Sequence, residues 1–241
     1  SYIKARILCI LNKYEESIGY CDKALQLYPE YAYANGLKGD NLYNLYLYDK
    51  ADALYQKAVG YFDKEITAAP KDADAYNNKG LVLYYLGQYD EAITYYDKAL
   101  AIDPNDAYAH NGKGSALNGL KKYDEAIGCY NKAIEIDPNG AYAYNGKGNA
   151  LLNVKRYDEA IANYDKAIEI DPRYTDAYNG KGSALSDLKR YDEAITYYDK
   201  AMEINPRYKY AYYNKGLTLY YLKQYEEAIT NYDKAIEIDP K

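Results

Sequence analysis

Prolines recur along this chain at a fixed interval. Six of them are each separated from the next by 34 residues: Pro70, Pro104, Pro138, Pro172, Pro206 and Pro240. Only Pro29 is out of step, by seven residues. A constant interval of this length is typical of a chain built from one repeated structural unit, and such units stack in a line. The repeat therefore constrains the fold more than any other feature of the sequence.

Each unit contains two stretches in which apolar residues have the spacing of amphipathic helices. In residues 73–106 the first stretch carries Tyr76, Gly80, Leu83 and Leu86. The second stretch carries Tyr89, Ala92, Ile93, Tyr96, Ala99 and Leu100. An acidic pair such as Asp90-Glu91 begins the second stretch, where the dipole of a helix N-terminus favours negative charge. An Asp-Pro pair ends it. Each unit is therefore predicted to be a helix, a turn and a second helix.

This pattern of aromatic residue, Gly, Ala, aromatic residue and Pro resembles the tetratricopeptide repeat, a helix-turn-helix unit. The resemblance implies an all-α fold, an α-solenoid of antiparallel helix pairs that coils into a superhelix with a concave groove. We expect one domain over residues 1–241. Its repeats are predicted at 1–31 (partial), 32–72 (with a seven-residue insertion), 73–106, 107–140, 141–174, 175–208 and 209–241.

Glycines recur in the first helix of the five regular units, at Gly80, Gly114, Gly148, Gly182 and Gly216. We expect Gly80 to face Ala92 in the second helix, because two helices cross closely where side chains are small. Asn-Gly pairs normally indicate hairpins, but those in phase with the repeat are predicted to be helical. Paired glycines such as Gly112 and Gly114 lower helix propensity by about 2 kcal/mol, so these helices should be stable only when stacked.

The insertion in the second unit is the main departure from the regular interval. Seven residues correspond to almost two helical turns, so they lengthen a helix without rotating its buried face. We expect one helix over residues 48–68. Its end, which carries the only Phe of the chain at Phe62, is interpreted as a projecting secondary contact surface.

Composition disfavours several classes of function. Lys and Arg number 30 and Asp and Glu number 36, and a net charge of -6 argues against non-specific binding of nucleic acid. No apolar run approaches the ~20 residues of a membrane span, so no membrane association is expected. Three cysteines without C-x-x-C spacing predict neither disulfides nor a zinc site. They favour a reducing, cytoplasmic location.

Candidate catalytic residues are few. The single histidine, His110, stands where other units carry Tyr, and we interpret it as an aromatic-sized packing residue. The Asp-Glu pairs recur in unit after unit, as helix-end charges do. Residues 112–115, Gly-Lys-Gly-Ser, resemble a phosphate loop only faintly, since no strand precedes them. We expect no enzyme in this span, and neither a metal nor a cofactor.

The resemblance implies a protein-binding scaffold, with the ligand on the inner face of the first helices. On this face an asparagine recurs in phase, and we call Asn77, Asn111, Asn145 and Asn179 the amide row. An amide offers both a donor and an acceptor, which suits the backbone of a peptide of any sequence. The alternative interpretation is that these are ordinary solvated helix residues.

The ends of the predicted groove differ from its middle. Tyr pairs mark the ends, at Tyr84-Tyr85 and Tyr220-Tyr221, and Tyr is well suited to anchor a partner. The residues predicted to contact a partner are Asn77, Asn111, Asn145, Asn179, Tyr84, Tyr85, Tyr108, Ser115, Asn118, Tyr142, Asn149, Asn153, Ser183, Tyr220 and Tyr221.

The predicted function is a protein-protein interaction scaffold whose partner is a protein or a peptide segment. Two alternatives remain: a substrate-recruiting arm of a larger enzyme such as a tetratricopeptide glycosyltransferase, and a helical-repeat RNA reader, which the acidic charge disfavours. A further expectation is end-to-end self-association through the last helix, whose apolar stripe carries no capping element. That stripe consists of Tyr225, Ile229, Tyr232 and Ile236.

Overall fold

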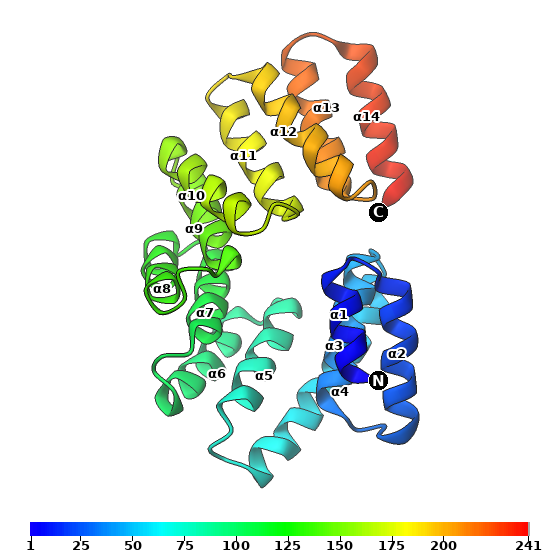
Figure 1. Ribbon diagram of the computed structural model, residues 1–241, viewed down its shortest axis with the longest axis vertical. Coiled ribbons are helices and arrows are strands. Elements are labelled where there is room, and N and C mark those ends of the chain that lie inside the picture. The colour runs from blue at the N-terminus through cyan, green and yellow to red at the C-terminus, as the bar shows by residue number, and fades with distance from the viewer. Residues whose placement is uncertain (241) are drawn as a thin grey trace. The chain divides into compact units, whose positions relative to one another are not determined.

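The computed structural model describes residues 1–240, which form fourteen α-helices and contain no strand (Figure 1). The helices are α1 (Tyr2–Ile10), α2 (Tyr14–Leu27), α3 (Ala32–Asn44), α4 (Tyr48–Ala68), α5 (Ala73–Tyr85), α6 (Tyr89–Ile102), α7 (Ala107–Gly119), α8 (Tyr123–Ile136), α9 (Ala141–Asn153), α10 (Tyr157–Ile170), α11 (Thr175–Asp187), α12 (Tyr191–Ile204), α13 (Lys209–Tyr221) and α14 (Tyr225–Ile238). The prediction of an all-α solenoid of helix pairs is confirmed.

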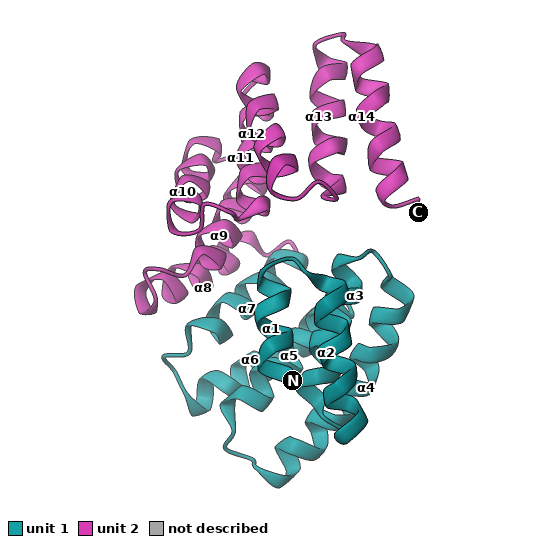
Figure 2. Ribbon diagram, turned by 45° about the vertical axis from the view of Figure 1, so that its right-hand side comes forward, with its two compact units in different colours: residues 1–120 teal, residues 121–241 magenta. Residues whose placement is uncertain are grey.

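The chain divides into two compact units, residues 1–120 with α1 to α7 and residues 121–241 with α8 to α14 (Figure 2). Within each unit a helix packs mainly on its neighbours in sequence, as α4 does on α3 and α5. First helices of successive pairs also touch, since α5 contacts α7 and α11 contacts both α9 and α13. Each unit is thus a stack in which first helices lie side by side.

One tyrosine in each of five second helices fills the space between helices. These residues are at most 1% exposed: Tyr55, Tyr96, Tyr130, Tyr164 and Tyr198. A Cβ atom added to Gly148 would lie 2.7 Å from the ring of Tyr164, and one added to Gly180 would lie 2.5 Å from it. The ring of Tyr164 therefore packs between the first helix of its own pair and the first helix of the next pair.

The glycines of the first helices pack against these tyrosine rings. The three atoms closest to a Cβ atom added to Gly80 belong to the ring of Tyr96, and not to Ala92. Gly112, in the next first helix, approaches the same ring from α7. The paired glycines that weaken the isolated helix therefore make room for a large ring in the assembled one.

Tyrosine suits these positions better than phenylalanine because the hydroxyl reaches a polar edge of the stack. The hydroxyl of Tyr164 donates to Oδ1 of Asn149 at 2.8 Å. The hydroxyl of Tyr55 donates to Oδ1 of Asp40 at 2.9 Å. Such partners favour Tyr over Phe at the positions of Tyr55 and Tyr164, in a chain with 37 Tyr and one Phe.

A recurrent ion pair joins successive helix pairs. Its lysine lies in a first helix and its aspartate 16 residues earlier, in the preceding second helix, as in Lys113–Asp97 at 2.6 Å and Lys181–Asp165 at 2.5 Å. Both lysines belong to Gly-Lys-Gly-Ser segments, which are helical here. The resemblance of these segments to a phosphate loop is thus explained by repeat packing.

His110 replaces a tyrosine in a hydrogen bond as well as in packing. Its Nε2 atom lies 3.1 Å from the carbonyl oxygen of Pro104. The hydroxyl of Tyr76 donates to the carbonyl of Pro70 at 3.3 Å in the same way. His110 therefore makes the same contact with its repeat as the tyrosine that it replaces.

The insertion forms part of one continuous helix, α4, as predicted. Its apolar end is not a free surface, because Phe62 is 1% exposed and packs edge-to-face on Tyr33 at 5.1 Å between ring centroids. The interpretation of Phe62 as a projecting contact residue was therefore wrong. The added turns enlarge the core of unit 1.

Candidate partner-binding site

Asn77, the first member of the amide row, is bonded to the next first helix. Its Nδ2 donates to Oδ2 of Asp106 at 3.1 Å. Asp106 caps α7, and its Oδ1 accepts from the backbone N–H groups of Tyr108 at 2.8 Å and Ala109 at 3.1 Å. Asn77 therefore orients the cap of the following helix.

Two further members of the amide row connect first helices in unit 2. Asn145 is only 7% exposed, and its Nδ2 donates to the hydroxyl of Tyr174 at 3.2 Å, at the start of α11. Oδ1 of Asn179 accepts from Nδ2 of Asn214 in α13 at 2.9 Å. The amide row thus has a structural role that the sequence pattern did not reveal, and Asn145 is buried rather than open to a groove.

Asn111 and Asn118 differ from these residues. Neither side chain makes a hydrogen bond to any of residues 1–240, and the Oδ1 atom of each is buried without a donor. A polar atom left in this state costs about 1–3 kcal/mol. Rotation of the amide group exchanges the positions of its oxygen and nitrogen, so either a donor or an acceptor can be turned toward a ligand. These two side-chain amides of α7 are therefore available for hydrogen bonds with a ligand.

Other predicted site residues are tied to the protein itself. The hydroxyls of Ser115 and Ser183 each donate to a carbonyl of their own helix at 3.1 Å. Asn149 accepts the hydroxyl of Tyr164, and Asn153 donates to the carbonyl of Asn149 at 2.9 Å. The side chain of Asn153 lies exposed, whereas Asn149 is half-buried.

Part of the exposed aromatic surface lies on tyrosines that the sequence predicted as partner contacts. The more exposed of them are Tyr108 at 73%, Tyr142 at 60%, Tyr221 at 55% and Tyr220 at 54%. Tyr84 and Tyr85 are half-buried, with their rings 5.5 Å apart. Sequence reasoning missed Tyr213, which is 53% exposed and stands where the amide row would continue, 34 residues after Asn179.

Asp40 is a second residue that the sequence analysis missed. It lies on α3, one residue after a first-helix glycine, in register with Ser115 and Ser183. Burial raises the pKa of this carboxyl to about 7, against a smaller opposite effect of the hydrogen bond from Tyr55. Among residues 1–240, no basic side chain comes within 4 Å of the carboxyl oxygens of Asp40.

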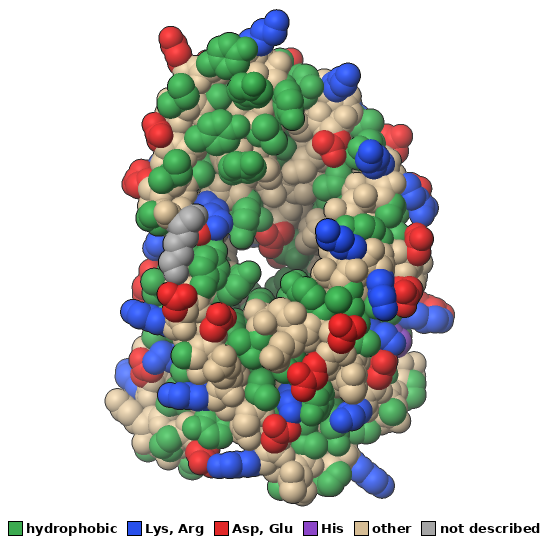
Figure 3. All heavy atoms as spheres, turned by 180° about the vertical axis from the view of Figure 1, so that it is seen from behind, with side chains coloured by type: hydrophobic (Ala, Val, Ile, Leu, Met, Phe, Trp, Pro, Cys, Tyr) green, Lys and Arg blue, Asp and Glu red, His purple; other side chains and the backbone are tan. Residues whose placement is uncertain are grey.

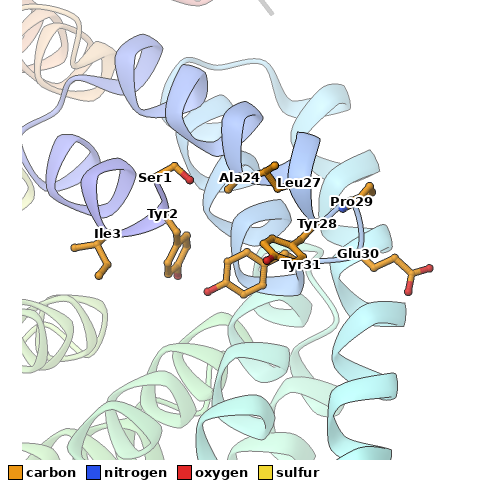
Figure 4. Close-up of a pocket in the computed structure, with 9 residues that line it drawn as sticks. All are labelled: Ser1, Tyr2, Ile3, Ala24, Leu27, Tyr28, Pro29, Glu30 and Tyr31. Atoms are coloured by element: carbon orange, nitrogen blue, oxygen red, sulfur yellow. The ribbon is translucent and has the colours of Figure 1, made fainter.

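A largely apolar cleft of about 860 Å³ lies near the start of unit 1 (Figure 4). The rings of Tyr2 and Tyr31 meet there edge-to-face at 5.2 Å. Leu27 and Tyr28 flank them and are 73% and 69% exposed. The cleft is separate from the predicted amide row.

The last helix carries exposed apolar side chains on one face. Tyr225, Ile229 and Ile236 are 52%, 59% and 59% exposed. Hydrophobic side chains gather in the upper part of Figure 3, where α13 and α14 lie. No described helix has the length and apolar character needed to cross a bilayer. Residues 1–240 contain no cluster of three or more His, Cys, Asp or Glu side chains placed to hold a metal ion.

Sequence and structure comparisons identify similar proteins. A family model of the tetratricopeptide repeat matches residues 73–106, 107–139 and 141–174, and a second model of this repeat matches residues 173–241. No curated protein matches the chain.

Solved structures share the fold. YrrB, described as a TPR protein with an unusual peptide-binding site, is 29% identical, with a TM-score of 0.53 over 75% of this chain and 93% of its own. MamA is 28% identical, with a TM-score of 0.56 over 67% of this chain and 94% of its own. TTC0263, a thermophilic TPR protein of Thermus thermophilus, is 21% identical, with a TM-score of 0.65 over 70% of this chain and 92% of its own.

Proposed function

Since the chain belongs to the tetratricopeptide repeat family, we propose that it is a protein-interaction scaffold that binds a peptide or an extended segment of a partner on its first helices. The observation that carries this proposal is the face of α7. There the unbonded amides of Asn111 and Asn118 lie on the same helix as Tyr108, which is 73% exposed. Amides of this kind pair with a peptide backbone, and an exposed Tyr supplies contact area at little cost in side-chain entropy. The peptide-binding site described for YrrB supports the same class of function.

Substitutions on α7 should weaken partner binding without unfolding the protein. A partner can be identified by affinity capture and mass spectrometry, and its affinity measured by calorimetry. We expect Tyr108→Ala together with Asn111→Ala to weaken binding by about 1–3 kcal/mol, because an aromatic contact and a backbone hydrogen bond are lost. The helical circular dichroism should not change, since the side chain of Asn111 bonds to nothing in residues 1–240.

Two control variants separate binding from folding. Asn131→Ala removes an exposed amide from the second helix α8 and should leave affinity unchanged. Asn145→Ala removes the bond to Tyr174 and should lower thermal stability. Equal affinities for the wild type and the α7 double variant would refute the proposal.

We also propose that the apolar face of α14 binds a second copy of the chain. In α12 the corresponding residues, Tyr191, Ile195 and Met202, are half-buried, and α13 packs on this helix. Tyr225, Ile229 and Ile236 offer the same kind of side chains to solvent. Such a patch favours association.

Self-association should be visible as a mass that rises with protein concentration in sedimentation or light scattering. Ile229→Lys should abolish the rise, because a charge in the centre of an apolar contact loses its hydration. Thr230→Lys, at the exposed neighbouring position, is the matched control. A mass that stays at the monomer value at all concentrations would exclude this contact.

A further inference from the structure

Asp40 carries a charge that its place in the fold does not require. In unit 2 the residue in register with it is Asn149, and Oδ1 of Asn149 accepts the hydroxyl of Tyr164 at 2.8 Å. Oδ1 of Asp40 accepts the hydroxyl of Tyr55 at 2.9 Å in the same way. A neutral amide thus fulfils the structural role. Four further first helices hold an uncharged residue at this register, namely Leu81, Ser115, Ser183 and Leu217, whereas α1 holds Arg6.

No basic side chain of residues 1–240 forms an ion pair with this carboxylate. The titratable side chains that face Asp40 from the helices packed around it are tyrosines and cysteines: Tyr2 and Cys9 of α1, Cys21 of α2, Tyr55 of α4 and Tyr85 of α5. Burial holds the pKa values of the Cys9 and Cys21 thiols at about 12, so both stay neutral. A half-buried carboxylate without a counter-ion is costly, and a cation from outside the chain would relieve that cost.

The tyrosine bonded to the carboxylate belongs to a group of packed aromatic rings. Tyr85 stacks on Tyr55 with an angle of 3° between the ring planes and 5.2 Å between centroids. Tyr43 packs against Tyr85 at 5.3 Å. The faces of aromatic rings attract cations, and a planar guanidinium can stack on a ring while it donates to a carboxylate.

We propose that Asp40, Tyr43 and Tyr85, which we call the Asp40 site, bind an arginine side chain of the partner, while Tyr55 stays buried and bonded to Asp40. This inference rests on the proposed scaffold function and adds a chemical requirement to it. The partner segment carries an arginine where it crosses α3 and α5. The net charge of -6 adds a long-range electrostatic attraction for a basic segment.

The probe for this site is N-acetyl-arginine amide, with the neutral isostere N-acetyl-citrulline amide as its control. Titration of the full chain is followed by NMR at the carboxyl carbon of Asp40. We expect a saturable shift with the arginine probe and binding weaker by about ten-fold or more with citrulline. Saturation with arginine should lower the pKa of Asp40 by about one unit or more, because the cation stabilises the charged form.

Variants test the residues of the site. Asp40→Asn retains an acceptor for Tyr55 and should remain folded, but it should remove the preference for arginine over citrulline. Tyr85→Leu should weaken binding of arginine while the charge remains. Asp52→Asn, at an exposed position of α4, is the matched control and should bind as the wild type does. Equal binding of the two probes, or an arginine preference that survives Asp40→Asn, would overturn the inference.

The captured partner distinguishes this inference from the function on which it rests. We expect Asp40→Asn to lower its affinity by about ten-fold, in addition to the loss caused by the α7 variant. If the partner binds Asp40→Asn normally but not the α7 double variant, the scaffold function stands and the arginine site does not. If neither variant changes the affinity, the proposed function itself is wrong.

Discussion

Replacing Tyr164 by Ala is expected to lower the free energy of unfolding by about 4 kcal/mol, a typical cost for removal of a buried aromatic ring. The ring is fully buried between Gly148 and Gly180, and neither glycine has a side chain that could fill the space. The substitution also removes the donor to Asn149. Urea unfolding followed by circular dichroism measures the change.

The glycines give a sharper test of the same contact. Gly180→Ala should destabilise the wild type by about 1–3 kcal/mol, because the new methyl group would overlap the Tyr164 ring. In the Tyr164→Ala background the same change should stabilise by about 1 kcal/mol, since only the higher helix propensity of Ala remains. Gly128→Ala in α8 is the matched control, because nothing lies within 4 Å of its added Cβ, and it should stabilise in both backgrounds. If Gly180→Ala stabilises the wild type, the Tyr164 ring does not pack tightly against Gly180.

The fold could be predicted from the sequence because the same residue pattern recurs in unit after unit. A local pattern that recurs every 34 residues predicts helix pairs, and the length of α4 follows from counting helical turns. The partner of each glycine could not be predicted in this way. Gly112 contacts a ring of the preceding pair, and such a contact depends on how two pairs stack.

The candidate site was predictable only in part. Exposed residues such as Tyr108 follow from the helical pattern, since they lie opposite the core stripe. Asn145 has the same register as Asn111, yet it is buried with a bond to Tyr174. The residue in register with Tyr174 one repeat earlier is Gly140, which has no side chain to accept such a bond. A difference in one neighbour thus decides whether an amide is open or bonded, and no periodicity encodes it.

Asp40→Asn is expected to change how stability depends on pH. Burial raises the pKa of Asp40 from its ordinary 3.8 to about 7 in the folded state. A group with a raised folded pKa stabilises the fold most when it is protonated, below its unfolded pKa. That contribution is lost as pH rises from about 4 through 7. The full shift corresponds to about 4 kcal/mol, and because Asp40 is partly exposed we expect about half of that.

The wild type and Asp40→Asn should therefore be equally stable near pH 4, while the variant should be more stable by about 2 kcal/mol at pH 8. Urea unfolding at several pH values measures the difference, and the titration of the other carboxylates cancels because both proteins share them. Asp52→Asn, an exposed substitution in the same unit, should show no such pH-dependent gain. Saturating N-acetyl-arginine amide should reduce the gap at pH 8, because a ligand of the charged carboxylate stabilises only the wild type. A gap that is the same at pH 4 and pH 8 would mean that the charge of Asp40 is solvated in the folded protein, and the reason for a cation at this site would be gone.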